Sequence, residues 1–176
     1  QARNLPSARR MRLPSPTLFL AVLVIGTAAV ASYWNSLHVP FVFDDASSIT
    51  TNPTIRRLWP LSEPLSPPLT NVTAQGRPIL NLSLAVNYAL GGTDVTGYHA
   101  LNVLIHALAA LTLFGLVRRT LERLPANGNV SDRRPQDRAP TLLALAIAVL
   151  WVVHPLQTES VTYVIQRAES LMGLFY

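Results

Sequence analysis

Three long apolar segments constrain this chain more than any other feature of its sequence. They cover residues 17–34, 98–117 and 140–153. As helices, the first would be about 27 Å long, roughly enough to cross a hydrocarbon core, and the third about 21 Å. With 49% hydrophobic and only 13% charged residues, the chain is too apolar for an ordinary soluble domain. The sequence therefore predicts an all-α, multi-pass membrane protein.

The basic residues predict how these spans are oriented. All 14 are Arg, and ten of them lie in residues 1–16 and 118–139, whereas residues 35–97 hold three Arg against four acids. The positive-inside rule then makes residues 1–16 a cytoplasmic tail and 118–139 a cytoplasmic loop, with 35–97 a large external loop. Residues 154–160 become an external turn, and 161–176 the start of a truncated fourth span. We expect the sequence to be an N-terminal fragment of a longer protein.

The external loop has two parts. Its Pro-rich stretch W-P-L-S-E-P-L-S-P-P-L predicts turns and extended chain. Residues 79–90 predict a short helix that ends at Gly91-Gly92 and lies at the membrane interface or packs against the spans. The first apolar segment has an alternative interpretation, because Ala29-Val30-Ala31 before Ser32 resembles a signal-peptide cleavage site. The later spans favour a retained membrane anchor.

Composition also excludes several classes of function. The chain has no Cys, which excludes disulfides, a thiolate nucleophile and Cys-based zinc sites. Its formal charge of +5 lies beside apolar segments and is not gathered on a soluble face. This distribution fits membrane topology and argues against a nucleic-acid partner.

Two adjacent carboxylates, Asp44 and Asp45, follow an apolar aromatic run in the external loop. In an extended segment, neighbouring side chains point to opposite faces, so one carboxylate faces a pocket while the other contacts backbone donors or a metal. A carboxylate at a membrane boundary suits a general base. It also suits a divalent cation, Mg²⁺ or Mn²⁺, that offsets a phosphate. The simpler alternative is an exposed pair that caps a turn.

A second polar group of residues lies near the end of the sequence. His154 and Pro155 precede Glu159, which would lie near a positive helix N-terminus. Arg167 and Glu169 follow within an apolar helix, where charges are costly and usually mark a site or a pathway. Alternatively, both charges pair with neighbouring spans.

Two further features of the sequence are candidate contacts. On the second span, His99 and His106 lie about 20° apart around the helix and Asn102 about 60° away, which makes one polar stripe. Hydrogen bonding between helices explains the stripe best, because a two-His metal site would need further ligands. Arg77, between Gly76 and Pro78, suits recognition of an anionic phosphate, or else it is a solvated residue in a turn.

The order of these motifs resembles one family. The strings are F-V-F-D-D (41–45), N-P-T-I (52–55), G-R-P-I-L-N-L-S-L-A-V-N-Y-A-L-G-G (76–92), G-Y-H-A-L-N-V-L-I-H-A-L (97–108) and H-P-L-Q-T-E-S-V-T-Y-V-I-Q-R-A-E-S-L (154–171). They resemble the N-terminal membrane part of the transmembrane and tetratricopeptide-repeat (TMTC) proteins. That family belongs to the GT-C class of multi-pass glycosyltransferases, which is related to the protein O-mannosyltransferases.

The resemblance implies a mechanism. GT-C enzymes move a sugar, here mannose or a similar hexose, from a polyprenyl-phosphate donor to a protein or glycan acceptor on the non-cytoplasmic side of the membrane. By analogy, one acid of the external pair deprotonates the acceptor hydroxyl for an inverting displacement, with Asp44 favoured over Asp45. Arg77 or Arg167 would hold the lipid phosphate. The resemblance also implies tetratricopeptide repeats after the membrane part, and we expect His154, Glu159 and Glu169 to line the pocket.

Two other functions stay open at this point. The chain could belong to a transporter or flippase that uses His99, His106, Arg167 and Glu169 as a polar pathway. It could also be a non-catalytic membrane scaffold for a repeat domain, in which case the acidic pair would be replaceable. The Arg-only basic usage and the lack of Cys suggest a bacterial plasma membrane, and a eukaryotic chain would lie in the endoplasmic reticulum.

Overall fold

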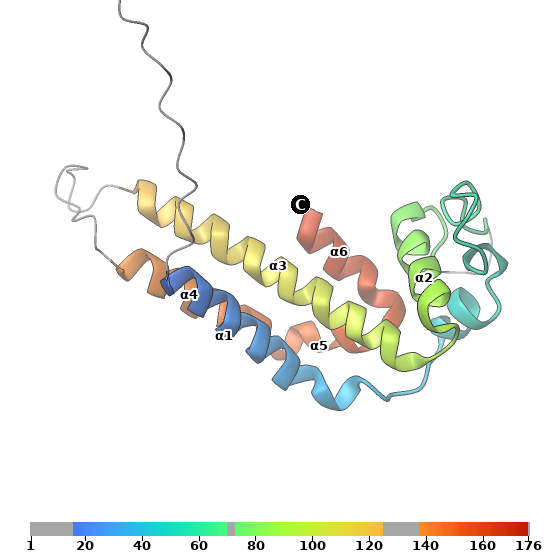
Figure 1. Cartoon of the computed structure of the whole chain (residues 1–176), viewed down its shortest axis with the longest axis horizontal. Coiled ribbons are helices and arrows are strands. Elements are labelled where there is room, and N and C mark those ends of the chain that lie inside the picture. Colours follow the sequence, from blue (N-terminus) through green and yellow to red (C-terminus); the bar gives the residue numbers. More distant parts are fainter. Residues whose placement is uncertain (1–15, 70–72, 125–137, 176) are drawn as a thin grey trace, which may run out of the picture.

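A computed structural model describes residues 16–69, 73–124 and 138–175. These residues form helices and connecting turns with no strand among them, which confirms the predicted all-α class. The Arg-rich tail and most of the 118–139 loop lie outside the described residues. Three helices run side by side, α1 (Pro16–Tyr33), α3 (Val95–Arg123) and α4 (Ala139–Val152), and together they form the membrane bundle (Figure 1).

The bundle contains the predicted membrane spans. By length and composition, α1 and α3 each suffice to cross a membrane, and α4 makes a third span if it is counted with the bent segment that follows it. That segment is a short helix from Pro155 to Gln157 (labelled η6) and α5 (Thr158–Thr162), and the bend measures 54°. Large apolar side chains on the outside of the bundle, such as Phe19 and Leu150, are exposed, as expected of a surface that faces lipid.

Small residues form the centre of the bundle. Ala21, Ala29, Ala144 and Ala148 are buried in one cluster, together with Ala110 on α3. Small side chains let helices approach closely. In a membrane the hydrophobic effect does not drive helices together, because lipid tails are as apolar as the helix surfaces, so close packing is what holds them. The alanines therefore explain why these three segments pack into one bundle.

A second core lies beside the end of the bundle where α1 ends and α3 begins, in a region that we call the outer cap after its predicted external position. The cap comprises residues 37–69 and 73–94, its main helix is α2 (Pro78–Gly91), and it packs on α3 and on α6 (Arg167–Phe175) (Figure 1). Helix α2 begins at a Pro, whose missing N–H costs nothing in a first turn, and it is capped after Gly91 by Gly92, which has a φ of 62°. The core of the cap consists of Ile49, Ile55, Ala74, Leu80, Leu84, Ala85, Tyr98, Val164 and Ile165.

Polar side chains tie the cap together. Asn81 is fully buried, accepts a hydrogen bond from the Asn52 amide at 2.9 Å, and donates to the Pro64 carbonyl at 2.8 Å. The Asn52 amide also donates to the Ser48 carbonyl at 3.0 Å. A loop with few regular elements leaves backbone groups unpaired, and these two amides pair some of them.

The polar stripe on α3 has a comparable role in the bundle. Helix α4 ends at Val152, and the Leu156 N–H that a continuing helix would direct at the Val152 carbonyl donates to His154 Nδ1 instead, so this carbonyl has no partner along its own helix. His106 donates to that carbonyl at 3.0 Å, and Tyr33 adds a second hydrogen bond at 3.3 Å. Asn102 donates to the Val161 carbonyl at 3.0 Å. His99, the third member of the stripe, contacts the Val39 carbonyl at 3.0 Å. Interhelical hydrogen bonding thus accounts for the stripe.

Candidate functional site

The acidic loop docks on the segment that follows α5. The backbone N–H of Asp44 donates to the Tyr163 hydroxyl at 3.0 Å, across 119 residues of sequence. Asp45 accepts a hydrogen bond from the Ile165 N–H at 2.9 Å. The structure therefore brings two of the predicted motifs, the acidic pair and the 154–170 segment, into direct contact.

The two neighbouring carboxylates have different surroundings. Asp45 is 1% exposed, and its two oxygens accept the N–H groups of Ile165 and of Val42, the latter at 3.2 Å. Burial raises the pKa of Asp45 above its ordinary value of 3.8, although these backbone hydrogen bonds and nearby His99 pull it back. The Asp45 side chain therefore anchors the loop to the segment that follows α5.

Asp44 is the accessible member of the pair. It is exposed, and its Oδ2 accepts a hydrogen bond from Thr73 at 2.8 Å, while Oδ1 has no partner among the described residues. The preceding residue, Phe43, has a φ of 44°, a left-handed conformation that is uncommon for a bulky side chain. Strained backbone of this kind clusters at functional sites. The loop thus presents one free carboxylate oxygen on a constrained turn.

Two of the three predicted pocket residues lie together. Glu159 and Glu169 line a polar pocket of about 410 Å³, the acidic pocket, together with Gln157 and Gln166. Glu159 is also within electrostatic reach of Tyr163, the residue bonded to the acidic loop. His154 does not line this pocket. Its Nδ1 instead accepts the Leu156 N–H at 3.2 Å and caps the short helix after α4.

Arg77 lies at a second groove that shares Glu169 with the acidic pocket. This groove has a volume of about 310 Å³ and lies between the start of α2 and α6. Its other walls are largely apolar and include Ile79, Leu171 and Phe175. Arg77 is exposed, and its side chain makes no hydrogen bond or ion pair with a described residue, so its guanidinium is free to meet an anion.

Arg167, the other arginine predicted to hold a phosphate, is 0% exposed. Its guanidinium donates to the side chains of Asn102 at 2.6 Å and Ser83 at 3.1 Å and to the Tyr98 carbonyl at 3.0 Å. It therefore joins α6 to α3 and α2. In this arrangement the Arg167 side chain faces protein acceptors and not a groove.

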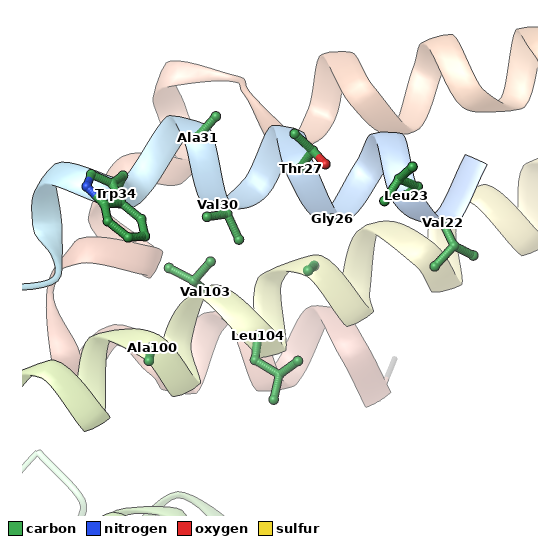
Figure 2. A pocket seen from close by; sticks show the side chains of 11 residues that line it. Val22, Leu23, Gly26, Thr27, Val30, Ala31, Trp34, Ala100, Val103 and Leu104 are labelled. Carbon is green, nitrogen blue, oxygen red and sulfur yellow. The ribbon is translucent and has the colours of Figure 1, made fainter. Parts of the chain in front are cut away.

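The most voluminous of these hollows has no such chemistry. It is a groove of about 660 Å³ between α1 and α3, lined by apolar residues such as Val30, Val103 and Leu104, with Trp34 near one end (Figure 2). No side chain that lines it is ionisable. The ionisable residues of interest gather at the outer end of the bundle.

Comparison with known proteins finds relatives that are similar to most of this chain. The chain is 31% identical over 167 residues to the mouse (Mus musculus) protein O-mannosyl-transferase TMTC3, a match that covers 90% of this chain and 16% of that protein. It is 33% identical over 181 residues to human TMTC4, covering 93% of the chain and 23% of that protein. The chain is TMTC-like. Protein O-mannosyl-transferase F38B6.6 of Caenorhabditis elegans is 30% identical over 161 residues, covering 88% and 21%.

The TMTC-like chain spans about a fifth of the length of these relatives. Neither a family model nor a solved structure matches it. The resemblance of the motifs to the TMTC proteins is thus confirmed by similarity over most of the chain.

The described part of the TMTC-like chain offers few ligands for a divalent cation. No three of its His, Asp and Glu residues group so as to hold a metal ion. Within the acidic pair, both Asp45 oxygens already accept backbone hydrogen bonds, so Asp44 alone has a free oxygen. These donors do not fit a protein-held Mg²⁺ or Mn²⁺ site, which needs several oxygen ligands.

Two residues of the site were not predicted from the sequence. Tyr163 holds the Asp44 backbone, and Thr73 holds the Asp44 side chain. Tyr163 lies within the 154–171 motif, so its position in that motif was the available signal. Thr73 carries no such signal, because a single Thr in a loop is common and its contact with Asp44 depends on the folded cap.

Proposed function

We propose that this TMTC-like chain contributes the catalytic loop of a membrane glycosyltransferase. The enzyme would transfer mannose or a similar hexose from a polyprenyl-phosphate donor to a protein hydroxyl, on the non-cytoplasmic side of the membrane. The observation that carries the proposal is the Asp44 loop, which docks on the 163–165 segment and leaves one oxygen of the exposed Asp44 carboxylate free. The names of the relatives, which are protein O-mannosyl-transferases, support the same class of reaction.

In this proposal Asp44 is the general base. As the acceptor oxygen attacks the anomeric carbon, its proton passes to the free Asp44 oxygen, and the bond from that carbon to the phosphate oxygen breaks. Polyprenyl phosphate leaves with the bonding electrons, and a single displacement inverts the anomeric centre. Positioned carboxylates contribute roughly 10²- to 10⁴-fold to such steps.

The donor phosphate would lie near Arg77. Negative charge on the phosphate grows as the bond to the sugar breaks, and a free guanidinium stabilises that charge. The apolar walls of the groove between α2 and α6 suit the first isoprene units of the donor. Arg167 is enclosed by protein acceptors, so we assign this contact to Arg77. Glu159 and Glu169 would then line the sugar side of the same site.

The compartment follows from the relatives in this proposal. The relatives named above are animal proteins, and they give no support to a bacterial plasma membrane. We place the TMTC-like chain in the membrane of the endoplasmic reticulum, with the acidic loop on the lumenal side. The Arg distribution along the sequence agrees with that orientation.

A transfer assay tests the proposal. The full-length protein in nanodiscs would receive a polyprenyl-phosphate mannose donor and a hydroxyl-bearing peptide. We expect Asp44→Asn to lower kcat by roughly 10²- to 10⁴-fold while the protein stays folded, because an amide accepts no proton. The matched control is Asp94→Asn, since Asp94 caps the start of α3 and Asn caps a helix equally well.

Two outcomes would contradict the proposal. Full transfer by Asp44→Asn would mean that the loop is structural. No transfer by the wild-type protein with any sugar donor would favour a scaffold or a transporter. Asp45→Asn adds a further comparison. If this variant loses folding while Asp44→Asn loses only catalysis, Asp45 has a structural role and Asp44 a catalytic one.

A further inference from the structure

A pocket beside the acidic loop has no role in the proposed chemistry so far. It has a volume of about 510 Å³ and lies between the end of α1, the loop at Val39 and Val42, and α5. Thr158 of α5 lines this pocket, whereas its neighbour Glu159 lines the acidic pocket. We name it the neutral pocket, because none of its lining side chains is charged.

Three polar side chains of the neutral pocket are free to bind a ligand. Ser32, Asn35 and Thr158 are exposed, and no described residue makes a side-chain hydrogen bond with them. The other hydroxyls that line the pocket already have hydrogen-bond partners, for example Ser36, which donates to the Tyr33 carbonyl at 2.7 Å. The free groups comprise two hydroxyls and one amide, which together donate and accept hydrogen bonds.

The lining selects the kind of ligand. Without a cation, the pocket offers nothing to neutralise the phosphate of a lipid donor, whereas Arg77 lines the groove on α2 and α6. Val39 and Val42 add an apolar wall. Neutral amide and hydroxyl groups beside an apolar wall suit an extended peptide, whose backbone needs hydrogen bonds and whose small side chains need apolar contact.

The position of the pocket links it to Asp44. Tyr163 forms part of its wall, and the Tyr163 hydroxyl accepts the Asp44 N–H at 3.0 Å. Val42, another wall residue, is two positions before Asp44. We propose that the neutral pocket binds the acceptor polypeptide beside the hydroxyl that receives the sugar. This inference rests on the proposed function and adds the acceptor-binding residues to it.

Steady-state kinetics of the full-length protein in nanodiscs test the inference. We expect Asn35→Ala and Thr158→Val each to raise the KM for a peptide acceptor roughly 2- to 10-fold, because each removes a neutral hydrogen bond. The kcat and the KM for the polyprenyl-phosphate mannose donor should stay within about twofold. A contact that binds the peptide equally well in the ground state and in the transition state affects the peptide KM and not kcat. Thr93→Val, an exposed threonine outside the pocket, is the matched control.

A second readout separates this inference from the proposed function. A photo-crosslinking amino acid in place of Asn35 should capture the peptide with or without turnover, and one in place of Thr93 should not. Capture without any sugar transfer would support peptide binding in the neutral pocket and contradict the proposed transferase activity. An unchanged peptide KM in an active enzyme, or no capture at position 35, would overturn the pocket. A rise in the donor KM instead would show that the pocket receives the sugar of the donor.

Discussion

The membrane bundle and the outer cap use polar side chains in different ways. In the bundle, polar side chains are few, and those of the α3 stripe are directed at backbone carbonyls of neighbouring segments, as His106 is to Val152 and Asn102 to Val161. In the cap, polar side chains also bond to one another, as Asn52 and Asn81 do. Lipid supplies no hydrogen bonds, so the backbone groups left unpaired where a bundle helix breaks need partners from the protein itself.

The difference shows why the candidate site lies where the two regions meet. The cap tolerates irregular backbone, including the left-handed Phe43 before Asp44, because its own amides pair the loop. The 163–165 segment, which belongs to the core of the cap and also contacts α3 of the bundle, is the surface on which that loop docks. An exposed carboxylate held against a rigid partner is what a catalytic base requires.

The largest effect on stability is expected at Arg167, which joins the two regions. Arg167→Ala should lower the free energy of unfolding by ~3 kcal/mol, because the buried oxygens of Asn102, Ser83 and Tyr98 lose their donor at once. Thermal unfolding in detergent, followed by tryptophan fluorescence, measures this. Arg119→Ala, at an exposed position of α3, is the control. Equal melting temperatures for the two variants would mean that Arg167 does not join bundle and cap.

A smaller and more local effect is expected at Asn81, inside the cap. Asn81→Ala should cost ~2 kcal/mol, since it leaves one N–H of the Asn52 amide and the Pro64 carbonyl unpaired. Limited proteolysis should then cut the cap faster while the bundle stays resistant. Asn102→Ala is the comparison in the bundle, and we expect it to increase the rate of cleavage in the cap less than Asn81→Ala does. Identical cleavage patterns for both variants would show that bundle and cap unfold together.

The comparison also shows what the sequence could predict. The spans followed from hydropathy, and the polar stripe followed from helical spacing, because both patterns are local along the chain. The sequence predicted that one acid of the pair would contact backbone donors or a metal, but the local pattern does not say which acid or which donor, since the contact depends on the Ile165 N–H, 120 residues away. The buried position of Arg167 was missed for the same reason, as its acceptors come from α2 and α3. Contacts between the regions are therefore what the sequence left open.

Asp45 tests the junction through pH. Its pKa is raised in the folded protein by burial, so the folded state holds this proton more tightly than the unfolded state does. The stability gained in this way is fully present below the unfolded pKa of about 3.8 and is lost as pH rises through the folded value. Asp45→Asn has no proton to lose at this position, so its stability should not show this loss as pH rises.

The measurement for Asp45 is the difference in melting temperature between wild type and Asp45→Asn across this pH range. We expect the advantage of the wild-type protein to shrink as pH rises above 4. A constant difference would mean that the Asp45 carboxyl does not titrate differently on folding.

The smallest effect is expected at Tyr163, the residue against which the Asp44 loop rests. Tyr163→Phe keeps the ring and removes only the acceptor for the exposed Asp44 N–H, which water replaces in part. We therefore expect kcat to fall roughly 3- to 10-fold, with unchanged folding and little change in the donor KM, because Tyr163 positions the base without touching the donor. Tyr88→Phe is the matched control, since its ring packs under Arg56 and its hydroxyl bonds to no described residue. A melting temperature lowered along with kcat would make Tyr163 a packing residue, whereas a selective loss of kcat would show that bundle and cap cooperate to aim one carboxylate.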